Sequence, residues 1–163
     1  MKSVSSIPSK IYSLSALEQE IKRWRLKNKR IVFTNGVFDI LHEGHIASLS
    51  QAAGYAEILI VGLNSDASVK RLKGSSRPVN NENARALILA SMVMVDAVTI
   101  FEEDTPLELI KKILPDVLVK GGDYTIEQIA GAKEVIANGG EVILADMVAG
   151  ISTTKIIEKM QNG

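Results

Sequence analysis

Short apolar runs alternate along the chain with segments whose apolar residues recur at helical spacing. The apolar runs hold mostly Val, Ile and Leu with little polar alternation, which is typical of strands buried on both faces of a parallel sheet. The predicted strands are Ile31–Thr34, Glu57–Leu63, Ala97–Phe101, Asp116–Lys120 and Glu141–Ala145. The predicted helices lie near Ser15–Lys27, His45–Ala53, Asn83–Val93, Pro106–Leu114, Ala132–Asn138 and Thr153–Met160.

This alternation of strands and helices predicts an α/β fold. Right-handed crossovers would cover both faces of the sheet with helices. We therefore expect a Rossmann-like, doubly wound sheet of about five parallel strands in the order 3-2-1-4-5. Residues 30–163 would form this one domain, and residues 1–29 a helical extension packed on it. A ligand is expected beyond the carboxyl ends of the strands, at the topological switch point.

Composition narrows the class of protein. A chain of 163 residues suits one domain with a substantial core, and no apolar run approaches the ~20 residues of a membrane span. The N-terminus lacks the apolar core of a signal peptide, and the absence of cysteine excludes disulfides and thiolate chemistry. Nineteen basic and nineteen acidic residues cancel, which argues against a nucleic-acid surface. These features predict a cytoplasmic protein without membrane or nucleic-acid partners.

The cations gather in two clusters. The first, between Lys22 and Arg30, is best interpreted as the solvated face and C-terminal end of the first helix. The second, between Lys70 and Arg77, is bounded by Gly74-Ser75-Ser76 and Pro78, so it is predicted to be a loop.

The chain's only two histidines stand three residues apart in His42-Glu43-Gly44-His45, between a predicted strand and a predicted helix. A helix N-terminus attracts phosphate, and imidazoles there can donate to an anion whose charge is growing. Zinc proteases need histidines four apart on a helix, so the spacing of three does not match that type of metal site. The chain also has neither the P-loop nor the Gly-x-Gly-x-x-Gly fingerprint of dinucleotide-binding proteins. Metal ligation and simple turn capping remain the alternatives for this pair.

The stretch Thr34–His45 resembles the His-x-Gly-His signature of the cytidylyltransferase-like nucleotidyltransferase superfamily. Three further stretches resemble the same superfamily in the right order: the basic segment Lys70–Arg77, Arg85, and Gly150–Ile156. Together they cover roughly residues 30–160. The resemblance implies the α/β fold already expected and transfer of a nucleotidyl group.

A finer resemblance is to the heptose 1-phosphate adenylyltransferases, carried by Arg71–Asn80, Glu102–Pro106 and Val119–Tyr124. It implies transfer of AMP from ATP to D-glycero-β-D-manno-heptose 1-phosphate, giving ADP-heptose and pyrophosphate for lipopolysaccharide core synthesis. That activity is often fused to a sugar kinase; no kinase-sized segment is seen here, so a stand-alone transferase is expected. The alternatives are a glycerol-3-phosphate cytidylyltransferase, which Gly150–Ile156 also resembles, and a non-catalytic nucleotide sensor.

In the implied reaction the acceptor phosphate is itself the nucleophile, so the protein has to position groups and neutralise charge. Mg²⁺ is expected with ATP, held by phosphate oxygens and water, with no protein ligand predicted.

The apolar run Leu87–Val95 would suit a homo-oligomer interface or an ordinary core helix. Turn stabilisation is the alternative role for Asp39 and Asp123. The expected catalytic residues are His42, His45 and Lys73; the expected nucleotide- or phosphate-binding residues are Thr34, Asn35, Gly36, Phe38, Gly44, Lys70, Arg77, Arg85, Lys120, Gly121, Asp123, Ser152, Thr153 and Thr154; the expected acceptor-binding residues are Asp39 and Asn64.

Overall fold

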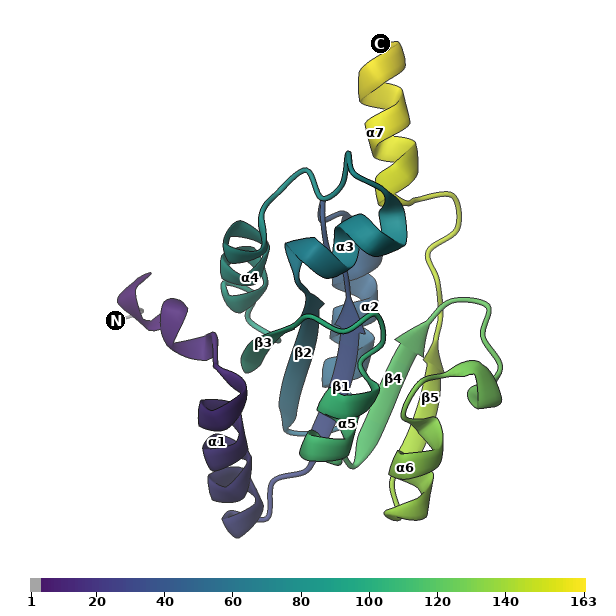
Figure 1. Ribbon diagram of the computed structural model, residues 1–163. Helices are drawn as coiled ribbons and strands as arrows, with labels where there is room; N and C mark the ends of the chain where they lie inside the picture. The colour runs from purple at the N-terminus through teal and green to yellow at the C-terminus, as the bar shows by residue number, and fades with distance from the viewer. Residues whose placement is uncertain (1–3) are drawn as a thin grey trace.

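The structure, a computed structural model, describes residues 4–163. One sheet of five parallel strands runs through the molecule in the order β3-β2-β1-β4-β5 (Figure 1). The predicted fold class and strand order are therefore confirmed, and each predicted strand end lies within two residues of the observed one. The strands are β1 (Ile31–Gly36), β2 (Ile58–Asn64), β3 (Ala97–Phe101), β4 (Val117–Gly121) and β5 (Glu141–Ala145).

Helices cover both faces of this sheet, because successive side chains of each buried strand point to opposite sides. In β1, Val32 joins a core with Leu49 and Leu89, whereas Ile31 and Phe33 join a second core on the other face. Helices α2 and α4 pack on the first core and α1, α5 and α6 on the second. The helices are α1 (Leu14–Leu26), α2 (Glu43–Ala53), α3 (Asp66–Lys73), α4 (Glu82–Ala90), α5 (Leu107–Ile113), α6 (Ala132–Ala137) and α7 (Thr153–Asn162), with 3-10 turns η1 (Val4–Ser6), η2 (Pro8–Lys10) and η3 (Ile126–Gln128).

Helix α3 corrects the predicted loop. Ser65 caps it, its Oγ accepting from the Ser68 amide at 3.1 Å, and Gly74 ends it with a φ of +97°. Lys70, Arg71 and Lys73 therefore lie in its last turn, and only the segment from Gly74 onwards is loop. The cap and the glycine stop were both visible in the sequence. The short helix between them has few apolar positions, which is why the helical spacing was missed.

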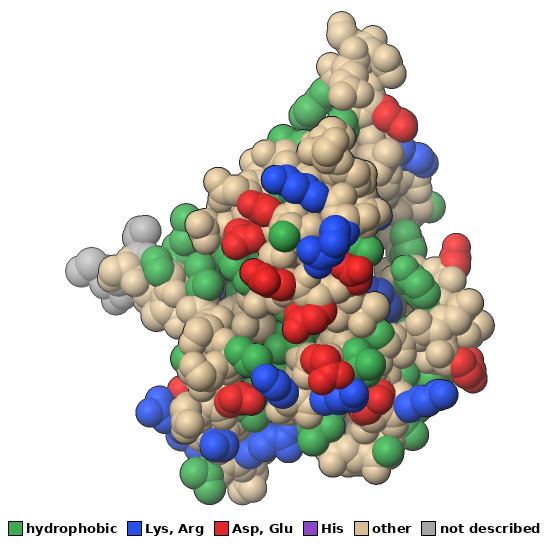
Figure 2. All heavy atoms as spheres, in the orientation of Figure 1, with side chains coloured by type: hydrophobic (Ala, Val, Ile, Leu, Met, Phe, Trp, Pro, Cys, Tyr) green, Lys and Arg blue, Asp and Glu red, His purple; other side chains and the backbone are tan. Residues whose placement is uncertain are grey.

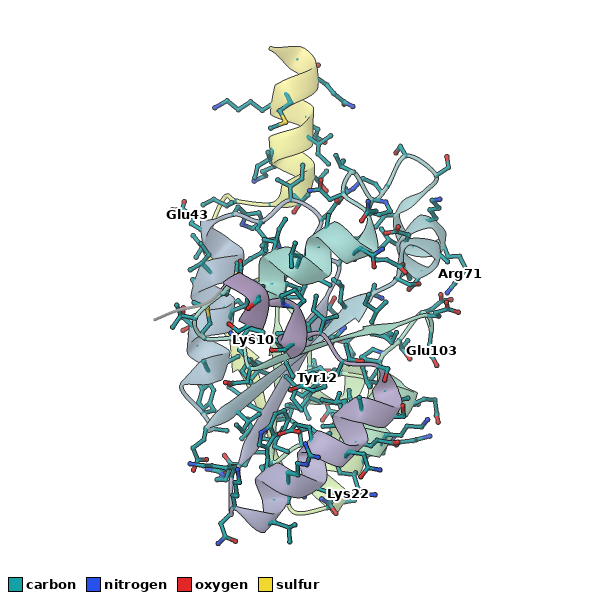
Figure 3. The ribbon with its side chains drawn as sticks, turned by 90° about the vertical axis from the view of Figure 1, so that its left-hand side faces the viewer. Lys10, Tyr12, Lys22, Glu43, Arg71 and Glu103 are labelled. Atoms are coloured by element: carbon teal, nitrogen blue, oxygen red, sulfur yellow. The ribbon has the colours of Figure 1, made fainter. Side chains whose placement is uncertain are left out.

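The N-terminal segment lies along the edge of the sheet. The Tyr12 amide donates to Val98 O at 2.8 Å, so it pairs with part of edge strand β3. Figure 3 shows Tyr12 between the N-terminal turns and α1, and its ring meets Trp24 edge-on. Burial raises the pKa of Tyr12. Nowhere in residues 4–163 is a helix long and apolar enough to cross a membrane.

Candidate active site

A cavity of about 650 Å³ opens at the carboxyl ends of the strands, and residues at or after the end of every strand line it. Strands β1 and β4, between which the strand order reverses, are both represented, as expected for this fold. The structure brings most of the predicted site together there. The predicted residues that line the cavity are Thr34, Asn35, Gly36, Phe38, Asp39, His42, Gly44, His45, Asn64, Lys73, Arg77, Lys120, Gly121, Ser152, Thr153 and Thr154.

Arg85, Lys70 and Asp123 are the predicted site residues that do not line it. Arg85 is fully buried, and its guanidinium donates to Asp66 Oδ1 at 2.6 Å. It also donates to the carbonyls of Val37, Asn64 and Asn80 at 2.7–2.9 Å. Its hydrogen-bonding capacity is used in joining three segments behind the cavity. The structure therefore gives Arg85 a structural position in place of the predicted phosphate contact.

The two imidazoles stack at the start of α2, with ring centroids 3.9 Å apart. His42 is the N-cap residue, and its Nδ1 accepts from the Gly44 amide at 3.2 Å. That hydrogen bond leaves the proton on Nε2, so a neutral His42 can donate from that nitrogen. The sequence analysis treated turn capping as an alternative to a role in the site. The structure shows that His42 caps the turn and also lines the cavity.

Burial disfavours the charged form of both histidines. The pKa of His45 is lowered to about 4, mainly by burial and to a smaller extent by the adjacent His42. Burial also lowers the pKa of His42, against a smaller opposite effect of Glu43. The Nδ1 of His45 is buried and has no hydrogen-bond partner among residues 4–163. A bound anion would offset the burial that now disfavours the charged imidazoles.

A side chain at either of two glycines would crowd the rings where the backbone turns. A Cβ at Gly44 would lie 3.0 Å from the ring of His42, and one at Gly36 would lie 2.9 Å from the ring of Phe38. Phe38 itself has a left-handed φ of +46°, which is strained for a non-glycine residue. Its ring packs 5.3 Å from that of His45. The turn thus fixes the orientation of the histidine pair.

Asp39 is buried and organises the loop after α3. Its carboxylate accepts from Arg77 Nε at 2.7 Å and from the amides of Val79 and Asn80 at 2.9–3.0 Å. Burial alone would raise the pKa of Asp39, but these donors together lower it. With both oxygens occupied, Asp39 fits the turn-stabilising alternative better than the predicted acceptor contact.

Lys73 and Lys120 bring positive charge to the cavity from α3 and β4. Burial lowers the pKa of Lys120, and the charge of Lys73 lowers it further. Its Nζ lies 5.8 Å over the ring of Tyr124, and neither lysine forms an ion pair within residues 4–163. Two lysines without an ion pair within residues 4–163 therefore line the same cavity, an arrangement that would attract an anion.

The first turn of α7 carries the predicted hydroxyl residues. Ser152 is the N-cap residue, since its Oγ accepts from the Lys155 amide at 3.2 Å. Thr153 donates to Ile40 O at 3.1 Å, which ties α7 to the histidine turn. Figure 1 shows the remainder of α7 projecting from the body. The amides of Thr153 and Thr154 and the hydroxyl of Thr154 have no hydrogen bond within residues 4–163, so they remain available to an anion at the cavity.

Some residues that line the cavity were not predicted from the sequence to belong to the site. Most of these residues come from the β3–α5 segment, from the segment between β4 and α6 and from the segment between β5 and α7. The only sequence signal for the first of these was the resemblance carried by Glu102–Pro106. The unselected lining residues include Leu72, Asp104, Thr105, Pro106, Tyr124, Gln128, Met147, Val148 and Ile151.

Comparison with known sequences gives strong matches. The cytidylyltransferase-like family matches residues 33–159. A bifunctional protein HldE from Rhodopseudomonas palustris is 60% identical over 147 residues, covering 90% of this chain and 30% of that protein. Another from Rhodospirillum rubrum is 53% identical over 160 residues, covering 98% and 32%. The chain thus spans about a third of the length of these curated relatives.

Solved structures share the fold. The lipopolysaccharide core biosynthesis protein from Thermoplasma volcanium is similar with a TM-score of 0.59 and 26% identity, over 74% of this chain and 97% of that one. Pantoate-β-alanine ligase from Francisella tularensis has a TM-score of 0.61 at 14% identity, over 93% and 76% of the two chains. The second likeness concerns the fold alone.

Proposed function

The chain belongs to the cytidylyltransferase-like family of nucleotidyltransferases, and from that premise we propose that it transfers AMP from ATP to D-glycero-β-D-manno-heptose 1-phosphate. The observation that carries the proposal is the stacked histidine pair at the start of α2, in one cavity with two lysines that form no ion pair within residues 4–163 and with the first turn of α7. The products would be ADP-heptose and pyrophosphate.

The chemistry needs no nucleophile from the protein. An oxygen of the sugar phosphate forms a bond to the α-phosphorus of ATP, and the bond from that phosphorus to the bridging oxygen of pyrophosphate breaks. Negative charge grows on the bridging oxygen and on the α-phosphate. His42 and His45 are proposed to donate N–H groups to this charge, each donor contributing on the order of 10²–10³ in rate.

The other groups are proposed to hold the reactants in line. Lys73 and Lys120 would draw together the α-phosphate and the acceptor phosphate, whose mutual repulsion opposes the reaction. Thr154 and the free amides of α7 would bind the departing pyrophosphate. Arg77, held through its Nε by Asp39, would offer its remaining guanidinium N–H groups at the cavity wall.

Mg²⁺ is proposed to arrive with ATP. No group of three His, Asp or Glu side chains suited to a metal occurs within residues 4–163. Phosphate oxygens and water would therefore be its main ligands, which suits the preference of Mg²⁺ for a largely hydrated shell. The ion would neutralise charge on the triphosphate.

The choice of substrate rests on likeness to relatives. Relatives named HldE match nearly the whole chain at 53–60% identity, and a structural relative is named for lipopolysaccharide core biosynthesis. Both agree with the resemblance of Arg71–Asn80 and Val119–Tyr124 to heptose 1-phosphate adenylyltransferases. Gly150–Ile156 favours a second candidate, glycerol-3-phosphate cytidylyltransferase.

Pyrophosphate release with two nucleotides and two acceptors tests the proposal. ATP or CTP is combined with heptose 1-phosphate or glycerol 3-phosphate, and the double variant His42→Gln/His45→Gln supplies the background rate. We expect ATP with heptose 1-phosphate to give the highest kcat/KM. A preference for CTP with glycerol 3-phosphate would establish the second candidate, and nucleotide binding without turnover in any pair would indicate a sensor.

A further inference from the structure

The β3–α5 segment has no role in the chemistry described above, although it lines the cavity. We propose that Asp104, Thr105 and Gln128 bind the hydroxyl groups of the acceptor sugar, and that Arg71 is the positioning residue that orients Asp104. This inference rests on the proposed function and deepens it, because it assigns the part of the cavity that distinguishes a polyhydroxylated sugar phosphate from a simpler phosphate ester.

The order of the strands places this segment on the acceptor side. The β3–α5 segment follows one edge strand of the sheet, and the β5–α7 segment follows the other, with the histidine pair after the central strand β1. In-line transfer requires the attacking oxygen and the departing pyrophosphate to lie on opposite sides of the α-phosphorus. If α7 binds pyrophosphate, the side of the cavity formed after β3 is left for the acceptor.

Asp104 is held with one oxygen occupied and one free. Its Oδ1 accepts from Arg71 Nε at 2.8 Å, and Arg71 also donates to the carbonyl of Glu102. Ser68 Oγ donates to Glu103 O at 3.0 Å. Helix α3 therefore also holds the backbone of the segment, at the carbonyls of Glu102 and Glu103. The Oδ2 of Asp104 has no hydrogen bond within residues 4–163, which leaves it able to accept from a sugar hydroxyl.

Arg71 acts from outside the cavity. It does not line the cavity, whereas Asp104 does. Figure 3 shows Arg71 and Glu103 on the same side of the molecule, where α3 meets the segment after β3. In Figure 2 acidic and basic side chains stand close together over α3, as a paired surface would. The guanidinium partly neutralises Asp104 and restrains its rotamer, and it leaves the second oxygen for a ligand.

Gln128 and Thr105 complete a set suited to hydroxyl groups. Gln128 Oε1 accepts from the Thr125 amide at 3.0 Å, so its NH₂ group is the part left to donate. The Thr105 hydroxyl has no hydrogen bond within the described chain and can both donate and accept. A carboxylate repels a phosphate dianion but accepts from hydroxyls. These three lining side chains are therefore chemically matched to the uncharged part of the sugar, and Lys73 and Lys120 to its phosphate.

The variant Asp104→Asn tests the assignment, with Glu103→Gln as the matched control. Glu103 is the adjacent carboxylate, does not line the cavity, and uses its Oε2 to accept from the Glu102 amide, which a glutamine can still do. Asp104→Asn should raise the KM for heptose 1-phosphate by about 10-fold, as expected for loss of one charge-assisted hydrogen bond. The Kd of ATP, measured by calorimetry, should stay within twofold, and Glu103→Gln should match the parent protein.

Two further measurements separate sugar binding from a general structural effect. Methyl phosphate, an acceptor without sugar hydroxyls, should be used equally poorly by the parent protein and by Asp104→Asn. Gln128→Met and Arg71→Gln should also raise the KM for heptose 1-phosphate, with kcat and thermal midpoint nearly unchanged for Gln128→Met.

The outcomes distinguish this inference from the proposed function. If the parent protein gives no pyrophosphate from ATP and heptose 1-phosphate, the proposed function fails and the sugar assignment fails with it. If the parent protein turns over but Asp104→Asn keeps the same KM for the sugar phosphate, only the present inference is overturned. Equal losses of ATP and sugar-phosphate affinity in Asp104→Asn would overturn it as well.

Discussion

Replacing Asp39 by alanine should destabilise the protein more than it weakens acceptor binding. The carboxylate is fully buried and Arg77 is only 14% exposed. Removing the carboxylate of Asp39 leaves the mostly buried guanidinium of Arg77 and the amides of Val79 and Asn80 without their acceptor. Breaking a buried ion pair by deleting one partner typically costs 3–5 kcal/mol. Because Arg77 keeps some contact with water, we expect a loss of about 3 kcal/mol.

Related variants refine that figure. Asp39→Asn keeps an oxygen acceptor but loses the charge, so its cost should be about half as large. Arg77→Ala leaves Asp39 with its two backbone donors and should cost about 1–2 kcal/mol. Since the two side chains are partners, the double variant should lose less than the sum of the single losses, by about 1–2 kcal/mol.

Urea unfolding at pH 7, followed by circular dichroism and by the fluorescence of the single tryptophan, measures these losses. Steady-state kinetics on the folded variants measures the KM for the sugar phosphate. A stability within about 0.5 kcal/mol of the parent protein would refute the loop-organising role of Asp39. A large rise in the acceptor KM at unchanged stability would instead restore the acceptor contact expected from the sequence.

Three other changes probe separate parts of the account. Arg85→Met should lower the free energy of unfolding by about 3–5 kcal/mol, because Asp66 and three carbonyls lose their donor; a fall in ATP affinity at unchanged stability would contradict this. Gly44→Ala should lower kcat/KM on the order of 10²-fold by displacing the ring of His42, and unchanged kinetics would show that the ring has room to move. NMR titration of the two histidines should give a pKa of about 4 for His45, and ATP should raise it. As the pH falls, the unfolded chain takes up this proton before the folded protein does, so the free energy of unfolding should decrease between about pH 6.5 and pH 4. In His45→Gln that decrease should be about 1–2 kcal/mol smaller, after allowance for the partial exposure of the ring. An equal decrease in the parent protein and in His45→Gln would contradict the lowered pKa.

The parts of the molecule that follow from local pattern were predictable from the sequence. The apolar runs identify all five strands, since a strand buried on both faces must be apolar nearly throughout. The position of the histidine turn was also predictable, because the tetrapeptide stands between an apolar run and a segment of helical spacing, and His42 is indeed the N-cap residue of α2. Its placement beside the residues after β4 and before α7 followed from the topology.

What could not be predicted depends on contacts between segments distant in the chain. In the sequence, Arg85 and Arg77 are both arginines near a predicted phosphate site. Only the packing shows that the N–H groups of Arg85 donate to Asp66 and to three carbonyls instead of facing the cavity. Asp39 reads equally well as a ligand contact or a turn residue until its partners 38–41 positions away are known. Asp104 was overlooked because its link to Arg71 joins two segments 33 positions apart.

The single-turnover rate of His45→Ala tests the central claim most directly, which is that the paired imidazoles stabilise charge on the transferring nucleotidyl group. The account predicts a fall of about 10²–10³-fold in the rate of pyrophosphate release, with the Kd of ATP changed only a few-fold. A His45→Ala variant that binds ATP and releases pyrophosphate at the rate of the parent protein would contradict the account.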